Sequence, residues 1–335
     1  MAKLTQDVLI VKSAALGDVL RTTSLLPALK RRFGGKIWWL TAPGAVPLLA
    51  GNPLIDRVAT LSSLPGRKFP VVLSLEEDPA LARAAVESCA GVLVGIYPEG
   101  RRLRYTPSSA KYYDMSLLNP DPDGGHSGAD ALKKANRLTY AELWLSALGL
   151  PRRRVPPRLV LSKAERRRAA AWLSRAKLKR APIALNAGAG SRWPAKQLDE
   201  RRAAAVARAL AVLGRPVVLL GGADERERNA RIAKESGALA APVQSLRDFA
   251  ALVERCAAVV TTDSLALHVA TALRRPAIVL VGPTSSAELD VFGKGEKILP
   301  PSACPCFYKA NCMRERHCLD QIPPARVAAA VERWL

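Results

Sequence analysis

Residues 7–33, which read DVLIVKSAALGDVLRTTSLLPALKRRF, decide the fold. The apolar run Asp7–Lys12 predicts a buried strand, and the small residues of Ser13–Asp18 predict a turn. Apolar residues then recur at helical spacing over Val19–Phe33. Because a strand, a glycine-containing turn and a helix in this order open a parallel α/β unit, we expect a parallel sheet flanked by helices.

The first half continues this alternation, but residues 97–130 interrupt it. That segment is rich in Gly, Pro, Tyr and Arg and is predicted to be irregular. A loop of this length in an α/β domain is typically functional or disordered. The other elements expected here are strands at Lys36–Leu40, Pro70–Leu75 and Gly91–Ile96 and helices at Pro79–Ser88 and Arg137–Leu148.

The second half restarts the pattern after a predicted linker at Pro151–Pro157. Two consecutive doubly wound halves are the simplest account of this repetition. The expected strands are Pro182–Asn186, Pro216–Leu220, Ala258–Thr261 and Ala277–Val281, and the expected helices are Ser162–Lys179, Gln197–Leu213, Asp224–Ser236, Ser245–Cys256, Leu265–Leu273 and Pro324–Leu335.

Composition restricts the class of protein. With 335 residues, 49% hydrophobic and 24% charged, the chain is long enough for two domains and is not disordered. Lys and Arg number 51 against 29 acids, a net charge of +22, and residues 151–180 alone hold nine Arg and three Lys against one acid, Glu165. This excess predicts an anionic partner: nucleic acid, a membrane surface or a phosphorylated substrate. Only 5% of residues are aromatic and no base-reading motif is recognisable, which disfavours nucleic acid.

The thiols raise a separate question. No apolar run reaches the length of a membrane span, and Val8–Val11 is too short for a signal-peptide core, so we expect a cytoplasmic protein with reduced thiols. Two cysteines, Cys89 and Cys256, lie in apolar context and are expected to be buried. The remaining four follow a C-x-C-x5-C-x5-C pattern that departs from the common C-x2-C pairs of zinc sites, so a structural zinc ion, disulfides and free thiols all stay open. They are Cys304, Cys306, Cys312 and Cys318.

Four predicted loops lie where ligands bind in open parallel sheets, beyond the carboxyl ends of the strands. In the first, Asp18 either offsets the dipole of the helix that begins there or acts as a general base. The second, Asn186–Lys196, combines small residues such as Gly188 with Arg192 and Lys196. It has the spacing of neither a P-loop nor a dinucleotide-binding loop, and it is compatible with a phosphate site or a plain turn.

The third and fourth loops offer side chains that either cap helices or bind a ligand. Asp224 either accepts hydrogen bonds from ribose hydroxyls or caps a helix. Asp263 and Ser264 are good N-caps, but the strand-Thr-Asp-Ser-helix arrangement also aims hydroxyl and amide donors at one point, as a phosphate or a sugar requires. His268, on the helix that follows, is either structural or part of the same pocket.

Six segments then form a pattern that runs along nearly the whole chain. They are IVKSAALGDVL at 10–20, NAGAGSRWPAKQ at 186–197, LLGGADE at 219–225, TDSLALHVA at 262–270, GPTSSAE at 282–288 and the end of the Cys-rich tail, IPPARV, at 322–327. Together they resemble glycosyltransferase family 9, the lipopolysaccharide heptosyltransferases.

This resemblance implies a GT-B fold, in which two Rossmann-like, doubly wound α/β domains face a central cleft. It implies an acceptor-binding domain at 1–160, a donor-binding domain with the Cys-rich tail at 161–322, and a helix at 323–335 that packs back on the N-terminal domain. The implied reaction is an inverting, metal-independent transfer of a heptose or related sugar from an ADP-sugar, and no cofactor is required for catalysis.

The resemblance also assigns roles to residues, with Asp18 as the base that deprotonates the acceptor hydroxyl. The donor-binding residues are then Gly188, Arg192, Lys196, Asp224, Asp263, Ser264, His268, Gly282 and Thr284. The acceptor-binding residues are Ser13, Gly17, Arg101, Arg102 and Arg104.

The implied acceptor also explains the basic charge. It is a lipopolysaccharide core or another lipid-linked anionic glycan, whose precursors carry phosphates and acidic sugars at the cytoplasmic face of the inner membrane. The basic block 151–180 and the three arginines of residues 101–104 would hold the enzyme there as a peripheral protein.

Two other functions stay open at this stage. A nucleotide-sugar epimerase of the same architecture would need acids to move a proton at the sugar, and Glu76, Glu77 and Glu99 are the candidates. A non-enzymatic protein that binds nucleic acid or membranes through its basic surface, with a structural metal, would leave the four loops unexplained.

Overall fold

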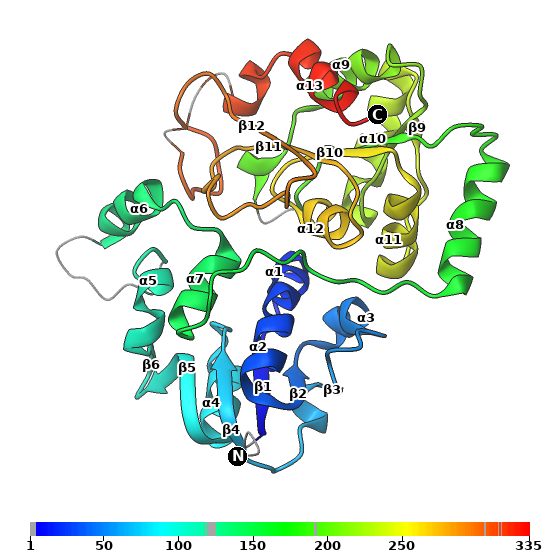
Figure 1. Ribbon diagram of the computed structural model, residues 1–335. Coiled ribbons are helices and arrows are strands. Elements are labelled where there is room, and N and C mark those ends of the chain that lie inside the picture. Colours follow the sequence, from blue (N-terminus) through cyan, green and yellow to red (C-terminus); the bar gives the residue numbers. More distant parts are fainter. Residues whose placement is uncertain are drawn as a thin grey trace. The chain divides into compact units, whose positions relative to one another are not determined.

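The structure is a computed structural model that describes residues 5–116, 118, 125–190, 193–304, 306–313, 315 and 317–335. The chain divides into two compact units, residues 1–160 and 161–335. Each unit contains one six-stranded sheet with helices packed against it (Figure 1). Within the described ranges, no helix is long and apolar enough to cross a membrane.

The sheet of the first unit has the strand order β3-β2-β1-β4-β5-β6. All neighbours are parallel except β6, which pairs antiparallel with β5. Its central strand β1 is buried from Val8 to Val11, because helices cover both faces of a parallel sheet. The strands are β1 (Gln6–Val11), β2 (Gly34–Leu40), β3 (Arg57–Ala59), β4 (Phe69–Ser74), β5 (Cys89–Glu99) and β6 (Arg102–Tyr105). The helices are α1 (Leu16–Thr22), α2 (Leu26–Phe33), α3 (Val46–Leu49), α4 (Pro79–Glu87), α5 (Ala110–Tyr113), α6 (Gly125–Ala135) and α7 (Tyr140–Ala147).

Two predictions for this unit are wrong. The single helix expected over Val19–Phe33 is instead two helices, α1 and α2, separated by a 3-10 turn at Thr23–Leu25. Pro27 lies in the first turn of α2, where its missing N–H is tolerated, whereas it would break a continuous helix. The segment 97–130 is also not irregular throughout, because it contains β6, α5 and the start of α6.

The sheet of the second unit has the order β12-β11-β10-β7-β8-β9, and every pair of neighbours is parallel. The strands are β7 (Ile183–Asn186), β8 (Val217–Leu219), β9 (Leu239–Ala240), β10 (Ala258–Thr261), β11 (Ala277–Leu280) and β12 (Gly295–Ile298). The helices are α8 (Lys163–Arg175), α9 (Glu200–Ala211), α10 (Arg226–Ser236), α11 (Leu246–Arg255), α12 (Leu265–Ala272) and α13 (Pro324–Glu332).

The last helix, α13, contributes to the core of the second unit. Its buried side chains, Val327, Ala330 and Val331, belong to the core of the second unit. There α13 packs mainly against α9 and also contacts β10, β11 and β12. We therefore assign α13 to the second unit, and its packing on the N-terminal domain stays a prediction of the resemblance.

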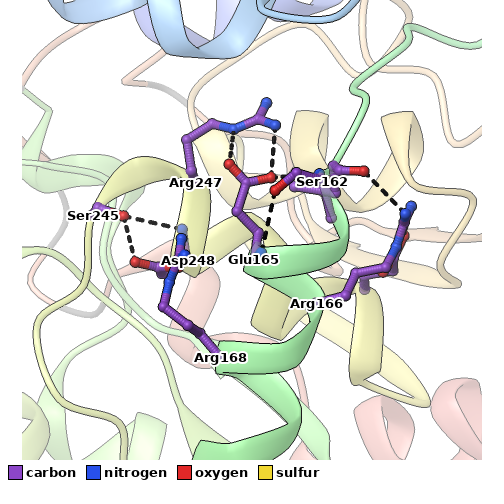
Figure 2. Close-up of polar contacts among 9 residues, drawn as sticks. Ser162, Glu165, Arg166, Arg168, Ser245, Arg247 and Asp248 are labelled. Carbon is purple, nitrogen blue, oxygen red and sulfur yellow. Dashed lines mark hydrogen bonds and ion pairs between the residues drawn. The ribbon is translucent and has the colours of Figure 1, made fainter.

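The basic helix α8 is fastened to α11 by ion pairs (Figure 2). Ser162 and Glu165 form a capping box that begins α8, and the Glu165 carboxylate also receives two 2.8 Å hydrogen bonds from the guanidinium of Arg247. Arg247 thereby lowers the pKa of Glu165 to about 2. Two further pairs join the same helices: Arg166 with Glu254 at 2.8 Å and Arg168 with Asp248 at 2.6 Å. Part of the basic block 151–180 is thus neutralised inside the unit.

Candidate active site at the carboxyl ends of the strands

In the first unit, a buried acid holds the loop after β1. Glu76 lies two residues beyond β4 and is only 7% exposed. One of its carboxylate oxygens accepts hydrogen bonds from the backbone N–H groups of Ser13 and Ala14, both at 2.8 Å, and from the Ser13 hydroxyl at 2.9 Å. The Lys12 ammonium lies 3.5 Å from the same oxygen. A buried carboxylate is stable when it has such donors, and here they fix the path of the loop.

Glu76 was not predicted in this role. From the sequence it is only a candidate acid for an epimerase, and no local pattern links it to Ser13, 63 positions earlier. Its carboxylate is occupied by the loop, and another of those candidates, Glu99, is ion-paired to Arg104 at 3.0 Å. The structure therefore gives no support to an epimerase site built on Glu76 or Glu99.

Asp18 lies in the first turn of α1, directly after this fixed loop. Its carboxylate is 33% exposed, and Oδ1 is 2.9 Å from Arg21 Nε in an ion pair. The Arg21 guanidinium in turn lies 3.9 Å above the ring of Tyr140, whose hydroxyl is 2.7 Å from Thr22 Oγ1. Burial raises the pKa of Tyr140 above its ordinary value, so that its hydroxyl stays neutral. Asp18 is thus a partly accessible carboxylate that is oriented by its ion pair with Arg21.

The residues predicted to bind an acceptor occupy two places in this unit. Ser13 and Gly17 are buried in the loop and the start of α1, and the Ser13 hydroxyl is used by Glu76. Arg101 and Arg102 are exposed where β5 turns into β6, while Arg104 on β6 pairs with Glu99.

In the second unit, Asn186 joins the ends of three neighbouring strands. It is the last residue of β7, and its Oδ1 accepts hydrogen bonds from Thr261 Oγ1 at 3.2 Å and Ser264 Oγ at 2.9 Å. Its Nδ2 donates to the carbonyl of Leu220 at 3.0 Å. The Ser264 hydroxyl also accepts from Ala266 N at 3.2 Å, so the predicted N-cap of α12 is present. Asn186 was not among the predicted site residues. An amide at the end of a buried strand is unusual, and this was the signal in the sequence that could have pointed to it.

An ion pair lies at the same edge of the sheet. Lys196 Nζ is 2.7 Å from Asp263 Oδ2, and each side chain is 15% exposed. Lys196 comes from the loop after β7, and Asp263 comes from the loop after β10. The ammonium also lies 5.0 Å from the centre of the Trp193 ring. The structure therefore brings together two predicted donor-binding residues that are far apart in sequence.

Glu225 holds the small-residue loops around this pair. Its carboxylate accepts hydrogen bonds from Gly222 N at 2.6 Å and Gly190 N at 3.3 Å. A side chain at Gly188 would displace Glu225, because an added Cβ would lie 2.2 Å from Glu225 Oε1. Asp224 is exposed in a 3-10 turn and directly precedes Glu225, which occupies the N-cap position of α10. The sequence predicted a role for Asp224, whereas the side chain that holds these loops is that of Glu225.

Two buried hydroxyls complete the edge. Thr262 follows β10 and Thr284 follows β11, and in the described part of the chain neither hydroxyl has a hydrogen-bond partner. An unsatisfied buried hydroxyl costs about 1–3 kcal/mol, so a ligand that supplied a partner would gain from both. Gly282 lies between them in the chain, and an added Cβ there would be 3.4 Å from the Ala195 carbonyl, an ordinary contact distance. His268 is buried on α12.

The Cys-rich tail packs against these loops. Tyr308 N donates to the Pro283 carbonyl at 2.7 Å, Ser285 N donates to the Tyr308 hydroxyl at 3.2 Å, and Ala195 N donates to the Ala310 carbonyl at 2.8 Å. The tail therefore supports both the loop that carries Lys196 and the loop that carries Thr284.

The four tail cysteines form two close pairs. The sulfurs of Cys306 and Cys312 are 3.7 Å apart, and those of Cys304 and Cys318 are 3.8 Å apart. The hydrogen bond with Cys304 and burial raise the pKa of Cys318, and burial raises that of Cys306. No group of three or more His, Cys, Asp or Glu side chains in the described ranges is arranged to hold a metal ion. Arg192, also predicted to bind the donor, lies outside the described residues.

Comparisons with known proteins place the chain in a family. The model of glycosyltransferase family 9 (heptosyltransferase) matches residues 130–317. No curated protein matches the chain. Among solved structures, the glycosyl transferase family 9 protein from Veillonella parvula is similar with a TM-score of 0.75 and 18% identity, over 98% of this chain and 97% of that one.

Two E. coli structures show the same fold. ADP-heptose lps heptosyltransferase II has a TM-score of 0.65 and 20% identity over 98% of both chains. Heptosyltransferase WaaC with ADP-2-deoxy-2-fluoro heptose has a TM-score of 0.62 and 20% identity over 98% of this chain and 99% of that one. These likenesses confirm the predicted fold class, two Rossmann-like α/β units of the GT-B type. Since the family model covers more than half of the chain, this protein belongs to glycosyltransferase family 9 and is a glycosyltransferase.

Proposed function

We propose that the enzyme transfers a heptose or a related sugar from an ADP-sugar to a lipopolysaccharide core or another anionic glycan. The observation that supports this most is the carboxyl edge of the second sheet. There the Lys196–Asp263 pair lies at the same sheet edge as two buried, unpartnered hydroxyls in a chain of the heptosyltransferase family. One related structure carries an ADP-heptose analogue, which makes ADP the first nucleotide to test.

In the proposed reaction Asp18 is the base. Its carboxylate accepts the proton of an acceptor hydroxyl, and the oxygen attacks the anomeric carbon on the face opposite the leaving group. The new glycosidic bond forms as the bond from that carbon to the diphosphate oxygen breaks, so ADP leaves with the electron pair and configuration inverts. The Arg21 ion pair supports this role, because it orients the carboxylate.

The second unit would stabilise the leaving diphosphate. Lys196 supplies a positive charge, the hydroxyls of Thr262 and Thr284 supply donors, and backbone amides near Ser264 and Gly282 add further dipoles. Oriented donors at a developing negative charge lower the barrier to its departure, so no metal ion is needed for the transfer step. The other proposed donor contacts are Arg192, Gly188, Asp224 at the ribose, and Asp263 and His268 at the sugar.

The first unit would bind the acceptor through Ser13, Gly17, Arg101, Arg102 and Arg104. Exposed arginines suit the phosphates and acidic sugars of a lipid-linked glycan. Such an acceptor lies at the cytoplasmic face of the inner membrane, so we place the enzyme there as a peripheral protein.

A structural zinc ion at the four tail cysteines is a separate part of the proposal. Tetrahedral zinc with bonds of about 2.3 Å separates its sulfur ligands by about 3.8 Å. The two observed separations, 3.7 and 3.8 Å, match this spacing, although each joins only two thiols. Elemental analysis and thiol titration of the unfolded protein test it: one zinc per chain supports the ion, and a metal-free chain rejects it in favour of free thiols or disulfides.

The first experiment is a thermal-shift panel with ADP, UDP, GDP and CDP, each with and without EDTA. Stabilisation by ADP that EDTA does not change supports the proposed donor and the metal-independent step. Stabilisation by another nucleotide would replace the donor, and no shift with any nucleotide would contradict the assignment of the second unit. Destabilisation by EDTA in the absence of nucleotide would indicate a structural metal.

A further inference from the structure

The opposite edge of the second sheet is lined by basic residues. Five of its six strands are preceded by at least one Lys or Arg, and the strands begin nearly level, with Ile183 beside Ala258 and beside Val217, and Ala277 beside Gly295. Because parallel strands share an amino edge, these cations lie along one side of the unit. We call them the basic edge: Lys177, Lys179 and Arg180 before β7, Arg215 before β8, Arg255 before β10, Arg274 and Arg275 before β11, and Lys294 before β12.

The charge of the basic edge is not neutralised by ion pairs with acids. In the described ranges none of the eight forms an ion pair, whereas Arg166, Arg168 and Arg247 are each paired with an acid between α8 and α11. The nearest acids along the chain, Glu254 and Glu296, are paired with Arg166 and Arg333. The row spans five neighbouring strands, which at about 4.8 Å per strand is about 19 Å.

Compensation of helix dipoles does not account for this charge. The helices α8, α9, α10, α11 and α12 all end at this edge, and cations at helix C-termini are favourable. Each helix end carries about half a negative charge, so five ends offset about two and a half of the eight positive charges. About five remain for an anionic partner.

We infer that the basic edge docks the enzyme on an anionic phospholipid bilayer. The charge fits phospholipid headgroups, and Val212, at the end of α9 three residues before Arg215, is 85% exposed. An exposed aliphatic side chain beside a row of cations suits the interface of a bilayer, whereas a nucleic acid backbone offers it no contact. The row itself contains no aromatic side chain on which bases would stack.

This inference rests on the proposed membrane contact and names the surface that makes it. That surface differs from the one predicted from the sequence. The sequence predicted a contact through the block 151–180 together with Arg101, Arg102 and Arg104, but α8 uses two arginines of that block to bind α11. The basic edge lies at the end of the strands opposite to the loops proposed to bind the donor. Docking there would leave those loops accessible.

The test is flotation of the full chain with vesicles of phosphatidylglycerol and phosphatidylcholine, compared with vesicles of phosphatidylcholine alone. We expect binding to the anionic vesicles that weakens as salt is added. The edge variant carries Lys179→Gln, Arg255→Gln and Arg274→Gln. The matched control carries Arg201→Gln, Arg226→Gln and Arg326→Gln, three exposed cations of the same unit that lie away from this edge.

Each cation near an anionic leaflet contributes about fivefold to partitioning, so the edge variant should bind about a hundredfold more weakly, with little change for the control. Equal losses in the two variants would show that net charge and not this edge is responsible, and would overturn the inference. No binding of the parent chain to anionic vesicles would overturn it as well. So would displacement from vesicles by duplex DNA together with a selective loss of DNA binding in the edge variant.

A thermal shift with ADP, measured on both variants, separates this inference from the proposed reaction. Both variants should keep the melting temperature and the ADP response of the parent chain. If ADP fails to stabilise the parent chain while the edge variant still loses vesicle binding, the proposed donor fails and the docking surface stands.

Discussion

Glu76 in the first unit and Glu225 in the second both accept backbone N–H groups from loops at the carboxyl ends of strands. Glu76 is buried and also contacts Lys12, whereas Glu225 is half-buried and holds Gly190 by a longer hydrogen bond of 3.3 Å. The loop before the proposed base is thus held by three hydrogen bonds to a buried acid, whereas the loops around the proposed phosphates are held by two hydrogen bonds to a half-buried one.

We expect the largest effect on sugar transfer from a substitution of Asp18. Asp18→Asn removes the proton acceptor but keeps the shape of the side chain, so transfer should fall by a factor of about a thousand, the range of general-base catalysis. Sugar transfer measured as ADP release, together with the ADP thermal shift, checks this. The shift should be unchanged, because the second unit is intact. Asp7→Asn, at another aspartate paired with an arginine of the first unit, is the control and should retain activity.

Lys196→Ala tests the edge of the second unit. It removes the cation paired with Asp263, and we expect the affinity for ADP to weaken about 10- to 100-fold, the value of a charge-assisted hydrogen bond. Calorimetric titration with ADP measures it, and Lys234→Ala, at an exposed lysine of the same unit, is the control. If the affinity for ADP is unchanged, the Lys196–Asp263 pair does not bind the donor and serves only as a structural contact.

The two loop anchors are compared directly by Glu76→Gln and Glu225→Gln. Glutamine keeps one acceptor oxygen and removes the charge. The resulting loss in the free energy of unfolding should therefore be larger where the side chain is more deeply buried. We expect Glu76→Gln to lower the free energy of unfolding by about 3 kcal/mol and Glu225→Gln by about 1 kcal/mol, since hydrogen bonds to buried charges are the costlier to lose. Urea unfolding measures both. Equal losses in the free energy of unfolding would mean that the two acids stabilise their loops equally.

The ion pair of Glu165 with Arg247 lies between α8 and α11 and gives a reference value for the stability that a contact outside the proposed site contributes. Its folded-state pKa of about 2 lies below the ordinary 4.5, so the pair stabilises the fold above pH 4.5 and loses that contribution as pH falls toward 2. Glu165→Gln should cost on the order of 2 kcal/mol at neutral pH and nothing near pH 2. Glu200→Gln, in an exposed pair with Arg231, is the control and should cost less than about 1 kcal/mol at either pH.

The sequence predicted the elements whose signal is local. The strand at residues 7–11, the loop before Asp18 and the capping of α12 by Ser264 follow from spacing and residue type alone. The short strands β3, β9 and β12 were missed, because two to four residues carry no period. The break between α1 and α2 at Pro27 was also missed, because the apolar spacing continues across it.

The site was predictable only in part, for a related reason. Asp18, Lys196 and Asp263 stand in recognisable loops, but their partners are set by the fold. Glu76 meets Ser13 across 63 positions, and Asn186 meets Ser264 across 78. The amphipathic pattern of α13 was recognisable in the sequence, but the core that its buried side chains join is set by the fold.

All four outer strands of the two sheets are short: β3 has three residues, β6 and β12 have four, and β9 has two. An exposed sheet edge is a template on which a second chain can add a strand, and such pairing is a common route to aggregation. Edges this short give an incoming strand few hydrogen bonds, and β6 meets its neighbour antiparallel across only four residue pairs. A chain that is 49% hydrophobic is thereby protected against self-association through its sheets.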